Sequence, residues 1–431
     1  MKKTGMRIFS LFLMAALAAG CASVNLKEGK KAYEEMRYSD AIWYLEKGLE
    51  KKDDPAARSM LADAYRITGN NGKAVEVYSQ TNLAPGTSDT EKINYARTLM
   101  SEGQYFEAKN ILEGVLSRDK TNQEAQSLLL SCKKQDELRR DSIMYVVTPV
   151  NIPSSDGAFS PVVSGNGLFI TMPKSSGDKD PYTSQSFTDI FFTSKSGETW
   201  SEPVALKGVN SPWHDASPVV SPNGQIMVFT RNFMLQSRAL GSNEQDQSTT
   251  QLYMSRRDAD GNWSKAEMLP FCDARYMFAH PAFSPDGSVL YFASDMKGTS
   301  GGLDLYESRF ADGSWGAPKN LGNDVNTKGD ECFPTMRDAD TLYYSSDSHE
   351  TIGGLDLIYS IRKDGIFGRP THLSYPINSQ RDDFGLVYNS PNTGYFSSNR
   401  TGSDRIYSFT IEKPVLLVNG LVTGQQSQLP L

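Results

Sequence analysis

One segment of this chain occurs twice, and the distance between the copies limits the folds that the chain can adopt. GGLDLYESRFADGSWGAPKNL begins at Gly301 and GGLDLIYSIRKDGIFGRPTHL begins at Gly353, 52 residues later. In both copies an aspartate is followed 11 residues later by an aromatic residue, and a proline stands three residues further on. Asp189, Trp200 and Pro203 repeat both intervals. A fixed offset of this length is typical of repeat architectures.

A β-hairpin pattern precedes each copy of this segment. It consists of an apolar stretch, a turn rich in Pro, Asn, Asp and Gly, and a second stretch rich in β-branched and aromatic residues. The instances are SPVVSGNGLFIT, SPVVSPNGQIMVFT, HPAFSPDGSVLYFAS, FPTMRDADTLYYSS and FGLVYNSPNTGYFSS. With two further strands after each hairpin, the pattern predicts four-stranded units of 52 to 63 residues. Such units, repeated radially, form a β-propeller.

The fifth unit lacks an outer strand of its own after Ile411, whereas IMYVVTPVNI at 143–152 is a strand without a preceding hairpin. We expect this N-terminal strand to complete the last blade and to close a five-bladed ring over 142–412, because closure removes exposed sheet edges. A six-bladed ring is the alternative. The hairpins resemble the TolB-type propeller repeat, a relative of the WD repeat, and the SPDG turn from Ser284 to Gly287 is the best copy.

Residues 21–140 have a different pattern, with apolar residues at helical spacing and almost no proline. Small residues align at Gly29, Ala62 and Ala96, and again at Ala41, Ala74 and Ala108, at offsets of 33 and 34 residues. That is the period of tetratricopeptide repeats, in which small residues stand where paired helices touch. The sequence therefore predicts an N-terminal tetratricopeptide-repeat α-superhelix, closed by a capping helix from about residue 122.

The first 20 residues have the composition of an export signal. A basic start is followed by a short apolar run and by small residues directly before Cys21. The stretch resembles a bacterial lipobox, which implies that Cys21 becomes the lipidated first residue; an ordinary signal peptide with a chance cysteine is the alternative. The formal net charge of −7 argues against a nucleic-acid partner.

Residues 413–431 contain a strand-like VNGLVTG segment, followed by LPL, that resembles the start of a carboxypeptidase-regulatory-like β-sandwich. The order of lipobox, helical repeats, TolB-like propeller and sandwich start resembles the PorE-like envelope lipoprotein family. That resemblance implies an outer-membrane lipoprotein, with its anchor on the periplasmic face and other envelope proteins as partners, including those of type IX secretion. Members of that family continue into an OmpA-like domain that binds peptidoglycan. The pattern in the present sequence stops before that domain, so we assign peptidoglycan binding to none of its residues.

Three carboxylates are candidates for a binding rim at the mouth of the propeller funnel. Asp215, Glu331 and Asp382 stand before the first strands of their blades, close to the expected ring axis. They would receive a cation or a basic segment of a partner; the alternative is that they accept hydrogen bonds from neighbouring backbone N–H groups. The aspartates of the repeated segment, Asp189, Asp304 and Asp356, are expected to accept such bonds in their own turns, and a role as calcium ligands is the alternative.

Two long connections are candidates for a partner-binding surface. Residues 173–188 and 231–250 join equivalent strands of adjacent blades and therefore project from one face of the ring. Loops of this length are usually functional or disordered. The second contains Phe233, Met234 and Leu235, apolar residues without an expected core strand, which favours a role as interface anchors.

No motif supports catalysis, a cofactor or a metal. The histidines His214, His280, His349 and His372 lie in different units, and the cysteines Cys132, Cys272 and Cys332 lack the spacing of metal ligands. We therefore expect a non-catalytic scaffold that binds other envelope proteins through its helical repeats and its propeller. A periplasmic sensor that holds a ligand in the propeller funnel is the alternative function, and a propeller hydrolase is a third hypothesis without a supporting cluster.

Overall fold

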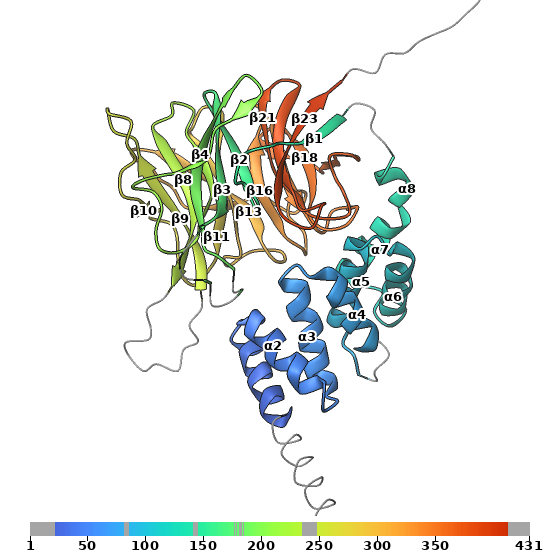
Figure 1. Ribbon diagram of the computed structural model, residues 1–431. Helices are drawn as coiled ribbons and strands as arrows, with labels where there is room; N and C mark the ends of the chain where they lie inside the picture. The colour runs from blue at the N-terminus through green and yellow to red at the C-terminus, as the bar shows by residue number, and fades with distance from the viewer. Residues whose placement is uncertain are drawn as a thin grey trace, which may run out of the picture.

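The computed structural model describes residues 22–81, 86–140, 145–234 and 248–412, except 176, 178, 181, 182 and 184. Helices come first and a five-sheet β-propeller follows, as the sequence predicts (Figure 1). Cys21 and 413–431 lie outside the described residues.

The helical layer begins with a helix over 22–34 and continues in antiparallel pairs. The further helices are α2 (Tyr38–Leu49), α3 (Pro55–Ile67), α4 (Asn71–Thr81), α5 (Asp89–Ser101), α6 (Tyr105–Arg118), α7 (Gln123–Lys133) and α8 (Gln135–Leu138). Asp54 caps α3 by accepting a bond from the N–H of Ala57, and Ser88 and Asn122 cap α5 and α7 in the same way. A Cβ on Gly29 would lie 2.7 Å from Leu45, so the helices touch at the small residues of the repeat.

Each propeller sheet is an antiparallel blade whose first strand lies nearest the ring axis. Blade 1 contains β2 (Phe159–Ser164), β3 (Gly167–Pro173), β4 (Thr188–Ser196), β5 (Thr199–Trp200) and β6 (Val204–Ala205). Blade 2 contains β7 (Asp215–Val220), β8 (Ile226–Met234), β9 (Ser248–Arg256) and β10 (Glu267–Met268). Blade 3 contains β11 (Phe278–Phe283), β12 (Val289–Ser294), β13 (Asp304–Ala311), β14 (Ser314–Trp315) and β15 (Lys319–Asn320).

The last two blades complete the ring. Blade 4 contains β16 (Glu331–Met336), β17 (Thr341–Ser346), β18 (Asp356–Lys363), β19 (Ile366–Phe367) and β20 (Thr371–His372). Blade 5 contains β21 (Asp383–Ser390), β22 (Thr393–Ser398), β23 (Arg405–Ile411) and β1 (Tyr145–Pro149). β1 pairs antiparallel with β23, from Tyr145 opposite Ile411 to Pro149 opposite Tyr407. The expected closure by the N-terminal strand is therefore confirmed, with five blades.

The propeller has no single central core. Its buried apolar side chains form five clusters, and each cluster joins two neighbouring blades. Tyr344 of blade 4 packs with Tyr291 of blade 3, for example, and Tyr395 of blade 5 packs with Ile170 of blade 1. Every blade is thus stabilised by both neighbours, whereas the helical layer has one continuous cluster along its length.

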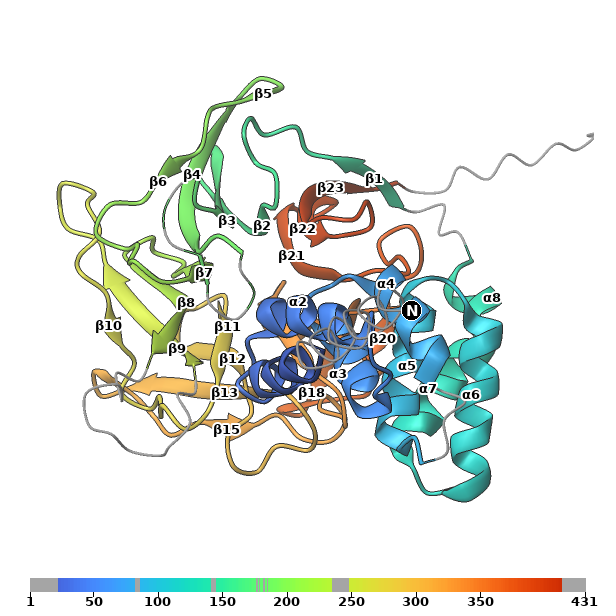
Figure 2. The same ribbon diagram turned by 60° about the horizontal axis from the view of Figure 1, so that its bottom comes forward.

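The helical layer covers one end of the propeller. In Figure 2, α2 and α3 lie across the middle of the ring, and α5, α6 and α7 lie beside them. The connections between the second and third strands of blades 3, 4 and 5 face these helices, together with the connections that enter the first strands of blades 4 and 5. Within the described residues no helix has the length and apolar character needed to cross a membrane.

Candidate functional site

The first strands share a feature that the sequence analysis did not predict. Each contains a β-bulge at a residue with positive φ, between 48° and 62°. These residues are Ser160, Ser217, His280, Phe333 and Gly385. Only one of them is glycine, and a non-glycine residue in this conformation costs on the order of 1–3 kcal/mol. At two of the bulges, the rings of His280 and Phe333 stack with their centroids 3.7 Å apart.

Hydroxyl groups connect three of these bulges to the preceding blade. The N–H of Ser217 donates to Thr171 Oγ1 of the preceding blade, and the N–H of His280 donates to Thr230 Oγ1. The N–H of Ser160 donates to Ser397 Oγ at 2.8 Å, across the point where the last blade meets the first. Neighbouring blades are therefore joined by polar bonds near the axis as well as by apolar contacts.

Asp215 and Glu331 do not present their carboxylates to the funnel, because both side chains are fully buried. Asp215 accepts bonds from the N–H and hydroxyl of Ser211 and forms an ion pair with Arg231 at 2.6 Å. Glu331 accepts bonds from the N–H and hydroxyl of Thr327. The rim-binding prediction is therefore wrong for these two residues, and the alternative of local capping is what the structure has.

The third predicted rim carboxylate, Asp382, was assigned one residue too early in the sequence. Asp383, and not Asp382, begins its blade as Asp215 and Glu331 do, and it accepts bonds from the N–H and hydroxyl of Ser379. Asp382 lines the space beneath the helices, but its Oδ1 accepts a bond from the N–H of Leu355. It therefore links blade 4 to the connection that enters blade 5.

The glycines of the repeated segment explain why the segment recurs. A Cβ on Gly301 would lie 2.3 Å from the backbone of Lys328, and one on Gly353 would lie 2.0 Å from the carbonyl oxygen of Gln380. No side chain fits at such distances, so each pair of glycines lets the next blade approach closely. The repeated segment is thus a contact between blades as well as a turn.

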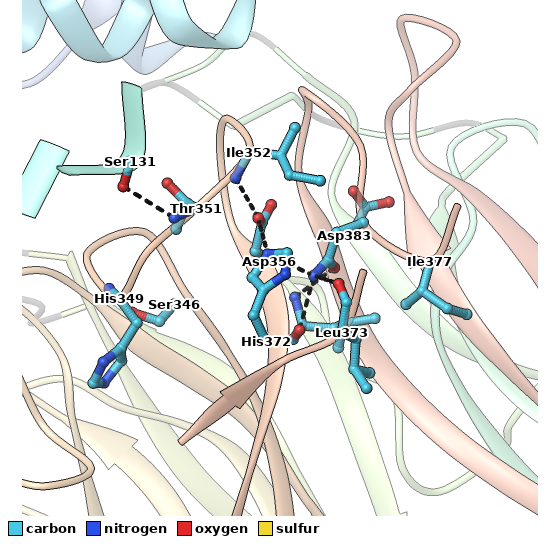
Figure 3. A network of polar contacts seen from close by, with 12 residues as sticks. Ser131, Ser346, His349, Thr351, Ile352, Asp356, His372, Leu373, Ile377 and Asp383 are labelled. Carbon is cyan, nitrogen blue, oxygen red and sulfur yellow. Dashed lines mark hydrogen bonds and ion pairs between the residues drawn. The ribbon is translucent and has the colours of Figure 1, made fainter. Parts of the chain in front are cut away.

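Two of the three aspartates of the repeated segment accept backbone N–H groups as expected, whereas Asp189 forms an ion pair with Lys174 at 3.1 Å. Asp304 accepts a bond from the N–H of Ser300, and Asp356 accepts one from the N–H of Ile352 (Figure 3). His372 Nε2 lies 2.6 Å from Asp356 Oδ2. Burial raises the pKa of Asp356 to about 6, and the bond to His372 opposes that shift.

One propeller connection makes several polar contacts with the helical layer, and we call its residues 346–352 the docking loop. Arg97 of α5 forms ion pairs with Asp347 of the loop at 2.5 Å and with Glu124 of α7 at 3.1 Å. The N–H of Thr351 donates to Ser131 Oγ at 3.0 Å, a bond drawn in Figure 3. Lys134 and Glu350 add an ion pair at 2.7 Å. No sequence pattern indicated these contacts, because their residues belong to two separate repeats.

Two cavities lie on the ring axis, one on each side of the bulges. A chamber of about 600 Å³ separates the helices from the propeller, and its lining includes Arg66, Arg97 and Asp382. A funnel of about 410 Å³ opens at the opposite end and is lined by the first strands of all five blades. His280 and Phe333 line both cavities and therefore form the wall between them. Burial lowers the pKa of His280 to about 3, so this wall is neutral.

The predicted partner-binding loops have more structure than expected. Phe233 and Met234 belong to β8 and pair with Thr249 and Ser248, so they are not loop residues. Leu235 lies outside the described residues. In the other connection, Phe187 is buried against Trp213, and the carbonyl oxygen of Thr183 accepts a bond from Ser39 of α2. This connection therefore contacts the chain's own helical layer.

The described part of the chain contains no group of side chains arranged to hold a metal ion. Cys132, Cys272 and Cys332 are free thiols, and burial raises the pKa of all three. A raised pKa disfavours the reactive thiolate. His214, His349 and His372 each have a hydrogen-bond partner within the propeller.

Neither a family model nor a curated protein sequence matches the chain. Among solved structures it is similar to TolB from Acinetobacter baumannii, with 16% identity and a TM-score of 0.32 over 67% of this chain and 70% of TolB. It is also similar to a Mycobacterium tuberculosis puromycin-hydrolyzing peptidase, with 15% identity and a TM-score of 0.34 over 60% of this chain. That match spans about half of the peptidase, 47% of its length.

A third similar structure is a Trypanosoma rangeli sialidase, with 10% identity and a TM-score of 0.37 over 63% of this chain and 60% of the sialidase. The five-bladed architecture of the present chain is defined by its own strand order and by the pairing of β1 with β23.

Proposed function

We propose that the protein is a non-catalytic interaction scaffold of a bacterial envelope, in which tetratricopeptide-type helical repeats and the propeller hold other proteins. In this proposal a lipid on Cys21 anchors the chain to the periplasmic face of the outer membrane. The partners would belong to an envelope assembly such as the type IX secretion machinery, which the resemblance of the domain order favours.

The observation that carries the proposal is the exposure of large aromatic side chains on the helical layer. Trp43 on α2 is 55% exposed and Phe106 on α6 is 69% exposed. Aromatic residues, Trp above all, supply much of the binding energy when a partner buries them. The docking loop contacts α5 and α7, so the helical layer that carries both aromatic side chains is attached to the ring.

The test is capture of partners from detergent-solubilised envelopes, with mass spectrometry of the eluate. Replacing Trp43 and Phe106 by alanine should abolish capture of a defined set of envelope proteins. The matched control is Phe310→Ala, because Phe310 is 42% exposed but lies in the propeller strand β13. Equal capture by the double variant and the wild type would contradict a role for this surface.

Lipidation has its own test. If Cys21 carries the anchor, Cys21→Ser should leave the chain unprocessed or release it from the membrane fraction. Radiolabelled palmitate should enter the wild type and not this variant. Cleavage and membrane association that remain unchanged in Cys21→Ser would contradict the anchor without affecting the capture experiment.

The funnel supports a second candidate function, that of a ligand-binding sensor. Its volume of about 410 Å³ falls within the range of about 300–1,000 Å³ for small-molecule sites. Val219 lines the funnel and is half-buried, so Val219→Trp should fill it. Native mass spectrometry that detects a small molecule on the wild type, but not on this variant, would favour the sensor over the scaffold.

A further inference from the structure

The buried carboxyl group of Glu331 differs from its equivalents in other blades. Asp215 has Arg231 at 2.6 Å, and Asp383 has Arg400 at 2.5 Å. Among the described residues, none forms an ion pair with Glu331, although its side chain is equally inaccessible to solvent. Ser346 stands opposite Glu331 in the strand register, where Arg231 stands opposite Asp215. Blade 4 therefore buries a carboxyl group without the cation that the equivalent groups have.

Glu331 is connected to the helical layer through the docking loop. Ser346 donates its hydroxyl to Glu331 Oε1 at 2.8 Å and accepts the N–H groups of Ser348 at 3.1 Å and His349 at 3.3 Å. The carbonyl oxygen of Ser348 in turn accepts a bond from Ser127 of α7. One hydroxyl group thus links the carboxyl group to the first turn of the loop that binds the helices.

We propose that Glu331 is a proton-controlled latch: the protonated side chain keeps the docking loop bound to the helical layer, and ionisation releases it. Ionisation places a negative charge in a site that water does not reach and close to Asp347, whose carboxylate holds Arg97. Release of the loop admits water to that charge, so the open arrangement favours the ionised form.

The surroundings of Glu331 are mainly acidic or neutral. The titratable and charged groups near it are Asp330, Cys332, Asp347, Tyr344, His349, Lys328 and Arg97. Arg97 forms ion pairs with Asp347 and Glu124, and Lys328 donates to the carbonyl oxygen of Ser300. Neither cation forms an ion pair with Glu331. Burial raises the pKa of Glu331 from 4.5 to about 8, bonds from Thr327 and Ser346 oppose the shift, and Asp347 adds to it.

The direction of the pH dependence follows from linkage. In the closed arrangement Glu331 binds its proton more tightly than in the open one, so the latch is complete below the ordinary pKa of 4.5. Docking weakens as the pH rises towards about 8, where the closed form itself begins to ionise. One proton changes the open fraction by at most about tenfold for each pH unit within that window.

The test is hydrogen exchange of the docking-loop amides in the full chain between pH 5 and pH 9, corrected for intrinsic exchange. Protection of Ser348, His349 and Thr351 should fall steeply with pH in the wild type. Glu331→Gln keeps a side chain that forms hydrogen bonds but cannot ionise, so its protection should stay nearly constant above pH 7. Asp215→Asn is the matched control from blade 2 and should keep the wild-type pH dependence.

Two results would overturn the latch. One is a wild-type pH dependence above pH 7 that survives in Glu331→Gln, since Asp356 and Asp404, with pKa values raised to about 6, titrate lower. The other is direct: carbon NMR of the Glu331 carboxyl in the folded wild type should give a pKa well above 6. A value near 4.5 would refute the proposal even if the variant fails to fold.

Discussion

The helical layer and the propeller bury apolar side chains in different ways. In the helical layer each helix packs on the next one along the chain, and one continuous core results. In the propeller each core joins two blades, and β1 reaches across the whole ring sequence to pair with β23. A linear array loses stability gradually from its ends, whereas a closed ring has no free end from which to open. The same chain therefore contains a region of graded stability and a region that depends on closure.

Among the changes that test this comparison of the helical layer with the propeller, removal of the closing strand β1 should have the largest effect. Deletion of Tyr145–Pro149 leaves β23 as an exposed edge and takes Tyr145 and Val147 from the core between blades 4 and 5. We expect the propeller to lose its cooperative transition or to melt more than about 10 °C lower. Thermal unfolding followed by near-UV circular dichroism measures this, with the helical far-UV signal as the internal control. An unchanged transition would mean that the ring does not need closure.

A pair of leucine truncations compares the two regions directly. Leu45 and Leu290 are both fully buried, one in the helical core and one between blades 2 and 3. Each change to alanine should cost about 2–5 kcal/mol. Leu45→Ala should lower the helical transition alone, and Leu290→Ala should lower the transition of the whole propeller, as measured by urea unfolding. If both variants shift both transitions equally, the regions unfold as one unit.

Arg97→Ala should weaken the contact between the two regions without unfolding either. It removes the ion pairs to Asp347 and Glu124, and the Arg97 side chain is only 17% exposed. Loss of a partly buried pair is expected to weaken docking by about 2 kcal/mol. Small-angle scattering should show a larger radius of gyration. Arg118→Ala is the control, because its half-exposed pair with Asp89 lies within the helical layer.

The smallest effect is expected for Lys134→Ala. Lys134 and Glu350 are about one-third exposed, so the pair contributes at most about 1 kcal/mol to docking. Added salt should reduce that contribution further. Hydrogen exchange of the Thr351 amide at low and high ionic strength measures it. A loss as large as that of Arg97→Ala would show that the outer pair, rather than the inner one, dominates the contact.

Sequence patterns predicted the parts of the fold that repeat. The hairpin pattern and the Asp-aromatic-proline intervals gave five blades, and the unmatched strand before the first blade gave the closure of the ring. These features are visible because strand periodicity and turn residues are local properties of a sequence. The capping role of Asp304 and Asp356 was predictable for the same reason.

The contacts that depend on two separate repeats were not predictable. Asp382 was assigned in place of Asp383 because the fifth blade has Gly385 at its bulge and lacks the proline that marks the other first strands. Phe233 and Met234 extend β8 because its pairing with β9 continues beyond the expected strand end. The docking of Arg97 on Asp347 has no sequence signal, since neither residue stands out within its own repeat.

The pairing of β1 with β23 also sets an order of events during synthesis. β1 leaves the ribosome before any blade exists, yet its partner strand ends at Ile411, near the end of the described chain. The helices can pack while translation continues, because their contacts lie between neighbours in sequence. β1 therefore stays unpaired until β23 emerges. Because β1 is already present at that point, the free edge of β23 is exposed only briefly. A nascent chain stalled before Arg405 should therefore have packed helices and an open ring, and it should bind holdase chaperones until elongation resumes.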